Sequence, residues 1–128
     1  MKNKIIIPSS IDEINSVYNW LEFQLKERVD MTLSQTILLV AQEITTNAVL
    51  HGNRLLPHKF VTIEFEISST SVIINISDEG KGIDKLPSKK EAEELDYLAE
   101  NGRGLKLAVL MSDKIEVDGS STKILFKI

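Results

Sequence analysis

The hydrophobic pattern changes its period once along the chain, and this change limits the possible folds more than any other feature. Between residues 11 and 52 the apolar side chains recur every three or four positions, which is the spacing of amphipathic helices. From Val61 to Ile67 they alternate with Thr62, Glu64 and Glu66, which is the spacing of a half-buried strand. We therefore expect clustered helices followed by strands, packed as two layers around one core.

The chain before residue 52 predicts one edge strand and two helices. The β-branched run at residues 4–7 is followed by a proline, which sheets tolerate at their edges. A capping box from Ser10 to Glu13 should begin a helix over residues 10–28. A second box, from Thr32 to Gln35, should begin a helix that ends near residue 52.

The segment between residues 68 and 101 predicts a hairpin followed by a polar stretch. A strand at residues 72–76 should pair with the strand before it, across a turn at residues 68–71. Residues 84–101 are charged and only weakly periodic, so we expect a loop there, with one short helix near residues 91–98.

The C-terminal quarter predicts one more helix and a closing hairpin. Gly102 to Gly104 should open a helix that continues into the apolar residues after them. Strands at residues 114–117 and 124–128 should flank a turn at residues 118–121. The order of elements predicts a single α+β domain over residues 1–128. It should be a two-layer α/β sandwich whose mixed, mostly antiparallel sheet has helices on one face.

Composition excludes several classes of function. The chain has 128 residues, a formal charge of −4 and no cysteine. Without cysteine there is no disulfide scaffold, thiolate zinc site or cysteine nucleophile. The acidic balance carries no electrostatic signature of nucleic-acid binding. No apolar run approaches the roughly 20 residues that span a bilayer. We expect a cytoplasmic protein that contacts neither nucleic acid nor membrane.

Three polar residues of the second predicted helix share one face. Glu43, Asn47 and His51 are spaced four apart, so they should line a cleft beside the apolar stripe. Glu43 could orient or deprotonate an attacking group. Asn47 offers a neutral oxygen to Mg²⁺, whose other ligands would be waters and phosphates. We interpret His51 as a helix-end cap near the cleft. Taken alone, the spacing fits a solvated helix face better.

The turn after the strand at residues 72–76 carries Asp78, Gly80 and Gly82. A carboxylate at the end of a strand can accept a hydrogen bond from an amine such as the adenine N6 group. Glycines beside it let a planar base approach the backbone. An ordinary glycine turn is the alternative interpretation.

Gly102, Arg103 and Gly104 precede the third predicted helix. The unpaired N–H groups and the dipole at a helix N-terminus attract anions. Arg103 could add positive charge against a phosphate. A loop-to-helix hinge, in which glycine only eases a tight entry, is the alternative interpretation.

In this order, the Glu-x-x-x-Asn helix, the DxGxG turn, the polar loop and the GxGL helix start resemble the GHKL, or Bergerat-fold, ATPases. The resemblance begins near Leu33 and continues to the C-terminus. Within that superfamily, the stretches TTNAVLHGN, DEGKGID and GRGLKL are most similar to the anti-sigma-factor serine/threonine kinases of bacterial partner-switching systems. The resemblance implies a kinase that uses ATP and Mg²⁺, binds a sigma factor and phosphorylates a serine on a small anti-anti-sigma antagonist. It also implies a possible homodimer.

The resemblance also implies a role for each matching residue. Glu43 would be the general base and Asn47 the Mg²⁺ ligand. Asp78 would bind the adenine, and residues 84–101 would form the lid. The other residues of the ATP site would be the pocket glycines Gly80 and Gly82, the phosphate-binding Gly102, Arg103 and Gly104, then Leu105, and Thr122 near the adenine edge.

Three other functions remain open. The domain could bind nucleotide only to fix its partner surface, because Glu100 and Asn101 stand where sporulation-type relatives carry a basic residue. It could be a detached histidine-kinase catalytic domain, although neither His51 nor His58 suits a phosphoacceptor. It could also be an interaction domain that binds no nucleotide and whose glycines are structural.

Overall fold

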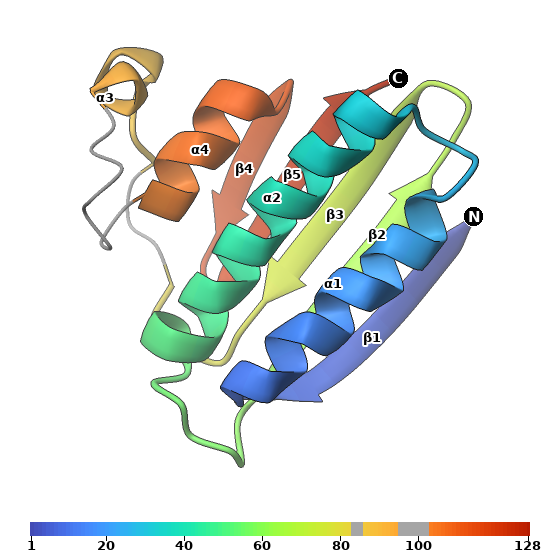
Figure 1. The fold of residues 1–128 in the computed structure, drawn as a ribbon. Helices are drawn as coiled ribbons and strands as arrows, with labels where there is room; N and C mark the ends of the chain where they lie inside the picture. Colours follow the sequence, from blue (N-terminus) through green and yellow to red (C-terminus); the bar gives the residue numbers. More distant parts are fainter. Residues whose placement is uncertain (83–85, 95–102) are drawn as a thin grey trace.

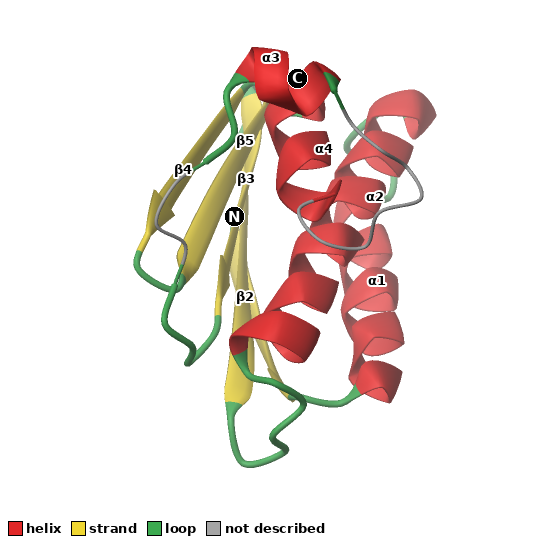
Figure 2. Cartoon of the chain, turned by 90° about the vertical axis from the view of Figure 1, so that its left-hand side faces the viewer, coloured by secondary structure: helices red, strands yellow, loops and turns green. Residues whose placement is uncertain are grey.

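The computed structural model describes residues 1–82, 86–94 and 103–128 of the chain. In these residues one five-stranded sheet is covered on one face by helices (Figures 1 and 2). The strands are β1 (Lys2–Pro8), β2 (Phe60–Ile67), β3 (Ser71–Ser77), β4 (Lys114–Asp118) and β5 (Ser121–Lys127). The helices are α1 (Ile11–Leu25), α2 (Met31–Asn47), the single π-helical turn η1 (Ala48–Gly52), α3 (Lys89–Glu93) and α4 (Arg103–Met111). The α+β two-layer fold expected from the hydrophobic periods is confirmed.

The sheet has the strand order β1-β2-β3-β5-β4, and each neighbouring pair of these described strands is antiparallel. The prediction of a mixed sheet is therefore wrong. The segment that contains α3 and α4 returns the chain so that β4 has the same direction as β3. The hairpin then places β5 between them, because β5 pairs with both. β3 and β4 are therefore parallel to each other, but they do not pair directly because β5 lies between them.

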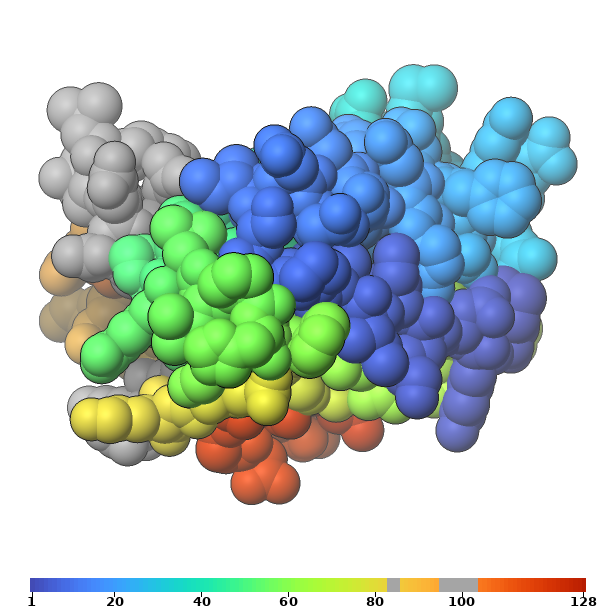
Figure 3. Space-filling model, turned by 90° about the horizontal axis from the view of Figure 1, so that it is seen from below, coloured from blue at the N-terminus to red at the C-terminus, as the bar shows by residue number. Residues whose placement is uncertain are grey.

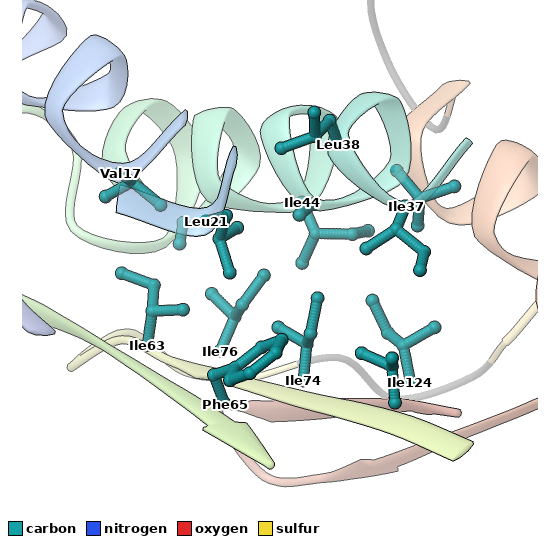
Figure 4. Close-up of a cluster of buried hydrophobic side chains, with 14 of the residues drawn as sticks. Val17, Leu21, Ile37, Leu38, Ile44, Ile63, Phe65, Ile74, Ile76 and Ile124 are labelled. Carbon is teal, nitrogen blue, oxygen red and sulfur yellow. The ribbon is translucent and has the colours of Figure 1, made fainter. Parts of the chain in front are cut away.

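The core lies between the sheet and the helical layer, in which α2 runs between α1 and α4 (Figure 1). Figure 4 shows Leu21 of α1 and Ile44 of α2 pointing toward Ile63, Ile74 and Ile76 of the sheet. All five side chains are buried. Full burial of such an aliphatic side chain stabilises the fold by about 1.5–3 kcal/mol. The periodic apolar residues therefore anchor α2 across the centre of the sheet.

The start of α2 differs from its prediction. Asp30, not Thr32, is the N-cap, and its Oδ1 accepts the N–H of Leu33 at 2.9 Å. Aspartate and threonine are both good N-caps, so the local sequence offers two equivalent starts. The path of the preceding turn decides between them, with Glu27 in the left-handed region at φ 66°.

The predicted ends of two other helices also change. At α1, Ser10 holds the N-cap position, but among the described residues its side chain makes no capping hydrogen bond, so the capping box is not formed. The same helix ends at Leu25 rather than near residue 28, before the left-handed Glu27. The short helix expected at residues 91–98 is seen as α3, which starts earlier through a capping box between Ser88 and Glu91. Residues 95–98 lie outside the described residues.

The predicted strands agree with the observed ones to within three residues at either end. β1 is an edge strand as expected, and it pairs with β2 through to Pro8. Both hairpins form, between β2 and β3 and between β4 and β5. Among the described helices, none is both long enough and apolar enough to cross a membrane.

Candidate functional site

A cavity of about 650 Å³ opens between the end of α2, the turn after β3 and the start of α4. Its volume lies in the range of small-molecule sites, about 300–1,000 Å³. Of the residues predicted to bind ATP, six line it: Asn47, Asp78, Gly80, Gly82, Leu105 and Thr122. These residues come from α2, the turn after β3, α4 and β5, so only the tertiary fold brings them together.

The carboxylate of Asp78 marks one end of the cavity. Its Oδ1 accepts the N–H of Gly80 at 2.7 Å, and its own N–H bonds the carbonyl of Ser120 at 3.1 Å. Partial burial raises the pKa of Asp78 above the usual 3.8, while the N–H of Gly80 and the charge of Lys59 act in the opposite direction. A half-buried carboxylate held in this way can accept a hydrogen bond from a ligand amine.

Glycines allow the backbone to approach Asp78 closely. A Cβ at Gly52 would lie 2.3 Å from Oδ2 of Asp78, and a Cβ at Gly80 would lie 2.4 Å from the carbonyl oxygen of Gly52. Gly82 has φ +91°, and a Cβ there would lie 2.3 Å from the carbonyl oxygen of Gly119. The sequence pattern predicts only a helix end at residue 52. Its position directly after His51, on the predicted polar face, was the signal that could have added it to the site.

Replacing Gly80 by alanine should destabilise the protein by about 1–3 kcal/mol, as overpacking does. The new Cβ would meet the carbonyl of Gly52, which is backbone and cannot rotate away. Chemical denaturation measures the change. Gly119→Ala is the matched control, because a Cβ there meets no atom within 4 Å and only the positive φ is strained. Wild-type stability in Gly80→Ala would contradict the packing described here.

Asn47 lies at the other end of the cavity, where α2 meets the start of α4. A Cβ at Gly104 would lie 2.5 Å from Nδ2 of Asn47 and 3.3 Å from the carbonyl oxygen of Glu43. The first turn of α4 is therefore packed directly on α2 at these two residues. Since the positive end of a helix dipole attracts anions, a phosphate next to Asn47 would be stabilised there.

The last turn of the second helix is π-helical. The N–H of Asn53 bonds the carbonyl of Ala48 at 2.8 Å, five residues earlier. Such wide turns occur frequently at functional sites. His51 lies in this turn at the exposed rim of the cavity, as expected for a residue at the helix end.

The wall between the two polar ends is largely apolar. Ile44, Ala48, Ile76 and Leu105 line it, and Thr122 of β5 adds a hydroxyl group at only 4% exposure. An apolar wall with a carboxylate at one end and a helix N-terminus at the other suits a flat base with an anionic tail. The Asn47 amide oxygen can also serve as one ligand of Mg²⁺, with waters and phosphate oxygens as the others.

The other predicted site residues either do not line the cavity or lie partly outside the described residues. Glu43 lies on α2 one turn before Asn47 and does not line the cavity itself. Arg103 is the first residue of α4, and Gly102 lies outside the described residues. Of the predicted lid at residues 84–101, the structure describes residues 86–94, which contain α3.

A family profile described as the histidine kinase-like ATPase domain matches residues 7–128. An anti-sigma F factor of Oceanobacillus iheyensis is 27% identical over 128 residues, which cover 96% of this chain and 88% of that protein. An anti-sigma F factor of Clostridium perfringens is 31% identical over 110 residues, which cover 78% of this chain and 76% of that protein.

Two solved structures are similar in fold. The structure of the RsbU and RsbW domains of Rv1364c from Mycobacterium tuberculosis has a TM-score of 0.66 at 16% identity, over 99% of this chain but only 32% of that chain. The histidine kinase domain of a blue-light activated histidine kinase from Erythrobacter litoralis has a TM-score of 0.53 at 17% identity, over 95% of this chain and 61% of that chain. At these identities the similarity concerns the fold alone.

Proposed function

The chain belongs to the family of histidine kinase-like ATPase domains, and we propose that it is an ATP-binding anti-sigma factor with protein serine/threonine kinase activity. In a partner-switching system it would bind a sigma factor and phosphorylate a serine on a small anti-anti-sigma antagonist. Relatives named anti-sigma F factor support this proposal. The observation that carries it is the cleft with Asp78 at one end and Asn47 beside the start of α4 at the other.

ATP would lie along this cleft in one direction. The adenine amine would donate to Asp78, and Gly80 and Gly82 would form the backbone turn beside the base. The phosphates would lie in the cleft beside Asn47 and the start of α4, where the helix dipole favours negative charge. Mg²⁺ bound to Asn47 would supply further neutralisation of the phosphate charge.

The transfer step needs alignment and a proton acceptor. The serine oxygen of the antagonist forms a bond to the γ-phosphorus, while the bond from that phosphorus to the β–γ bridging oxygen breaks and ADP leaves. The hydroxyl proton goes to the carboxylate of Glu43. Since Glu43 precedes Asn47 by one turn of α2, the helix holds the base and the phosphate-binding residue in a constant relation.

A second candidate is a regulatory module that binds nucleotide without transferring phosphate. The acidic and amide residues Glu100 and Asn101, where sporulation-type relatives carry a basic residue, favour this alternative. We also propose a cytoplasmic location. A homodimer is part of the proposal too, and β1 offers it an open edge of the sheet.

Thermal unfolding with and without nucleotide tests the ATP site. ATP or ADP with Mg²⁺ at about 100 times the dissociation constant should stabilise the wild type by roughly 2.7 kcal/mol. The midpoint should then rise by on the order of 2–8 °C for each kcal/mol. Asn47→Ala should lose the part of the shift that depends on Mg²⁺.

Asn15→Ala is the matched control, because Asn15 is an exposed residue of α1 that does not line the cavity. It should respond to nucleotide as the wild type does. No shift for the wild type with any adenine nucleotide would reject the proposed ATP site. It would favour instead an interaction domain with structural glycines.

A further inference from the structure

Asn53 is a fully buried polar residue to which the proposed function gives no role. It follows η1 directly, and 0% of its surface is exposed. It does not line the cavity. A buried amide must form its hydrogen bonds within the protein, because leaving them unmade costs about 1–3 kcal/mol each.

The side chain of Asn53 bonds three segments that are distant in the sequence. Its Nδ2 donates to Oγ of Ser9 at 2.8 Å and to the carbonyl of Phe60 at 3.0 Å. Its Oδ1 accepts the backbone N–H of Glu79 at 2.7 Å. Figure 3 shows the segment around residues 52–60, in green, against both the N-terminal segment, in blue, and the turn after β3, in yellow.

Two further hydrogen bonds close this network. Oγ of Ser9 donates to the carbonyl of Lys59 at 2.7 Å, and the carboxylate of Glu79 accepts the N–H of Phe60 at 2.5 Å. The end of β1, the start of β2 and the turn after β3 are thus joined around one amide group. Each of its two N–H donors has an acceptor, so its orientation is determined.

The bond to Glu79 acts on the peptide unit next to Asp78. The carboxylate of Asp78 is held by Gly80 on one side and packs against Gly52 on the other. Gly52 is the neighbour of Asn53 in the sequence. The amide therefore holds both the turn that carries the carboxylate and the backbone against which that carboxylate rests.

We propose that Asn53 is a positioning residue for the base site. It holds residues 78–80 in the position from which Asp78 accepts the adenine amine, and so it sets the preference for adenine over bases that lack this amine. This inference rests on the proposed function, because it requires ATP in the cleft.

A structural role alone makes a different prediction. If Asn53 only stabilised the fold, its loss would lower stability and leave base selectivity unchanged. The chain contains a suitable comparison in Asn3, whose Nδ2 donates to Oε1 of the buried Gln24 at 2.6 Å. This pair joins β1 to α1 and contributes no residue to the cavity.

The experiment measures dissociation constants of ATP and inosine triphosphate by calorimetry on the full chain. Inosine triphosphate has an oxygen in place of the adenine amine. The variants are Asn53→Asp and Ser9→Ala, with Asn3→Ala as control. An aspartate at position 53 keeps an acceptor for Glu79 but presents oxygen to the carbonyl of Phe60, so it cannot hold the same orientation.

We expect Asn53→Asp to raise the dissociation constant of ATP about tenfold, which corresponds to the net contribution of one hydrogen bond. The dissociation constant of inosine triphosphate should change little. The preference for ATP, which is the ratio of the two dissociation constants, should therefore fall toward one. Ser9→Ala should move the preference in the same direction by a smaller factor, and Asn3→Ala should keep the wild-type preference while its melting temperature falls.

An unchanged preference in folded Asn53→Asp would overturn the inference while leaving the proposed function intact. If Asn53→Asp does not fold, Ser9→Ala decides in the same way, since it removes only one partner of the amide. A wild type that binds no adenine nucleotide would instead overturn the proposed function, and this inference with it.

Discussion

Glu43→Gln should lower phosphoryl transfer by about 10²- to 10⁴-fold, the usual contribution of a general base, while ATP still binds. The glutamine keeps the shape of the side chain but cannot take the proton of the attacking serine. Binding should remain because Asp78, Asn47 and the start of α4 are unchanged, and Glu43 does not line the cavity. Transfer of label from γ-labelled ATP to a candidate antagonist measures the rate, and calorimetry measures ATP binding.

Glu116→Gln is the matched control for this experiment. Glu116 is an exposed acid on β4 whose partner is Lys114 at 2.9 Å, and it does not line the cleft. It should transfer label at the wild-type rate. Transfer by Glu43→Gln at that same rate would show that another group accepts the proton. A wild type that binds ATP but labels no antagonist would favour the regulatory module.

Asp78→Asn should remove most of the stabilisation by ATP without destabilising the protein when nucleotide is absent. In the wild type, Oδ1 of Asp78 accepts the N–H of Gly80, so an asparagine in the same position would turn its NH₂ group toward the adenine amine. Two donors would then face each other. Losing a hydrogen bond to a charged group should weaken the binding of ATP by roughly 10- to 100-fold.

The pH dependence of wild-type stability follows from the direction in which the pKa of Asp78 is shifted. Burial raises the pKa of Asp78, so between the usual 3.8 and the folded value the folded protein binds more protons than the unfolded chain. The stability of the nucleotide-free wild type should therefore fall as pH rises through this window. Above the window the penalty is complete, and Asp78→Asn should be at least as stable as the wild type.

Melting temperatures between pH 3 and pH 8, with and without ATP, check both statements. Asp118→Asn is the control, because Asp118 is exposed at the end of β4. It should keep the full response to ATP. A nucleotide-free Asp78→Asn that melts well below the wild type at neutral pH would show that this carboxylate stabilises the fold, contrary to its raised pKa.

The regular elements could be predicted because their signals are local. The alternation from Val61 to Ile67 depends only on which face of a strand is buried, and β2 has these bounds to within one residue. The spacing of the apolar residues predicted α2 in the same way. Its first residue could not be predicted, since Asp30 and Thr32 are both suitable caps and the turn before them decides.

The order of the motifs predicted most of the candidate site. Asn47, Asp78 and Thr122 are far apart in the sequence, and the family resemblance predicts that they share one pocket. The cavity lining confirms that they lie together.

The sequence by itself determined the periods of the strands and helices, and hence the two-layer fold with one core. Only the tertiary structure decided the antiparallel order of β3, β5 and β4, and the positions of Gly52 and Asn53 beside the turn that carries Asp78. The physical reason is the range of the interactions. Periodic burial acts within a few residues, whereas the hydrogen bond from the N–H of Glu79 to the Oδ1 of Asn53 joins residues 26 apart in the sequence.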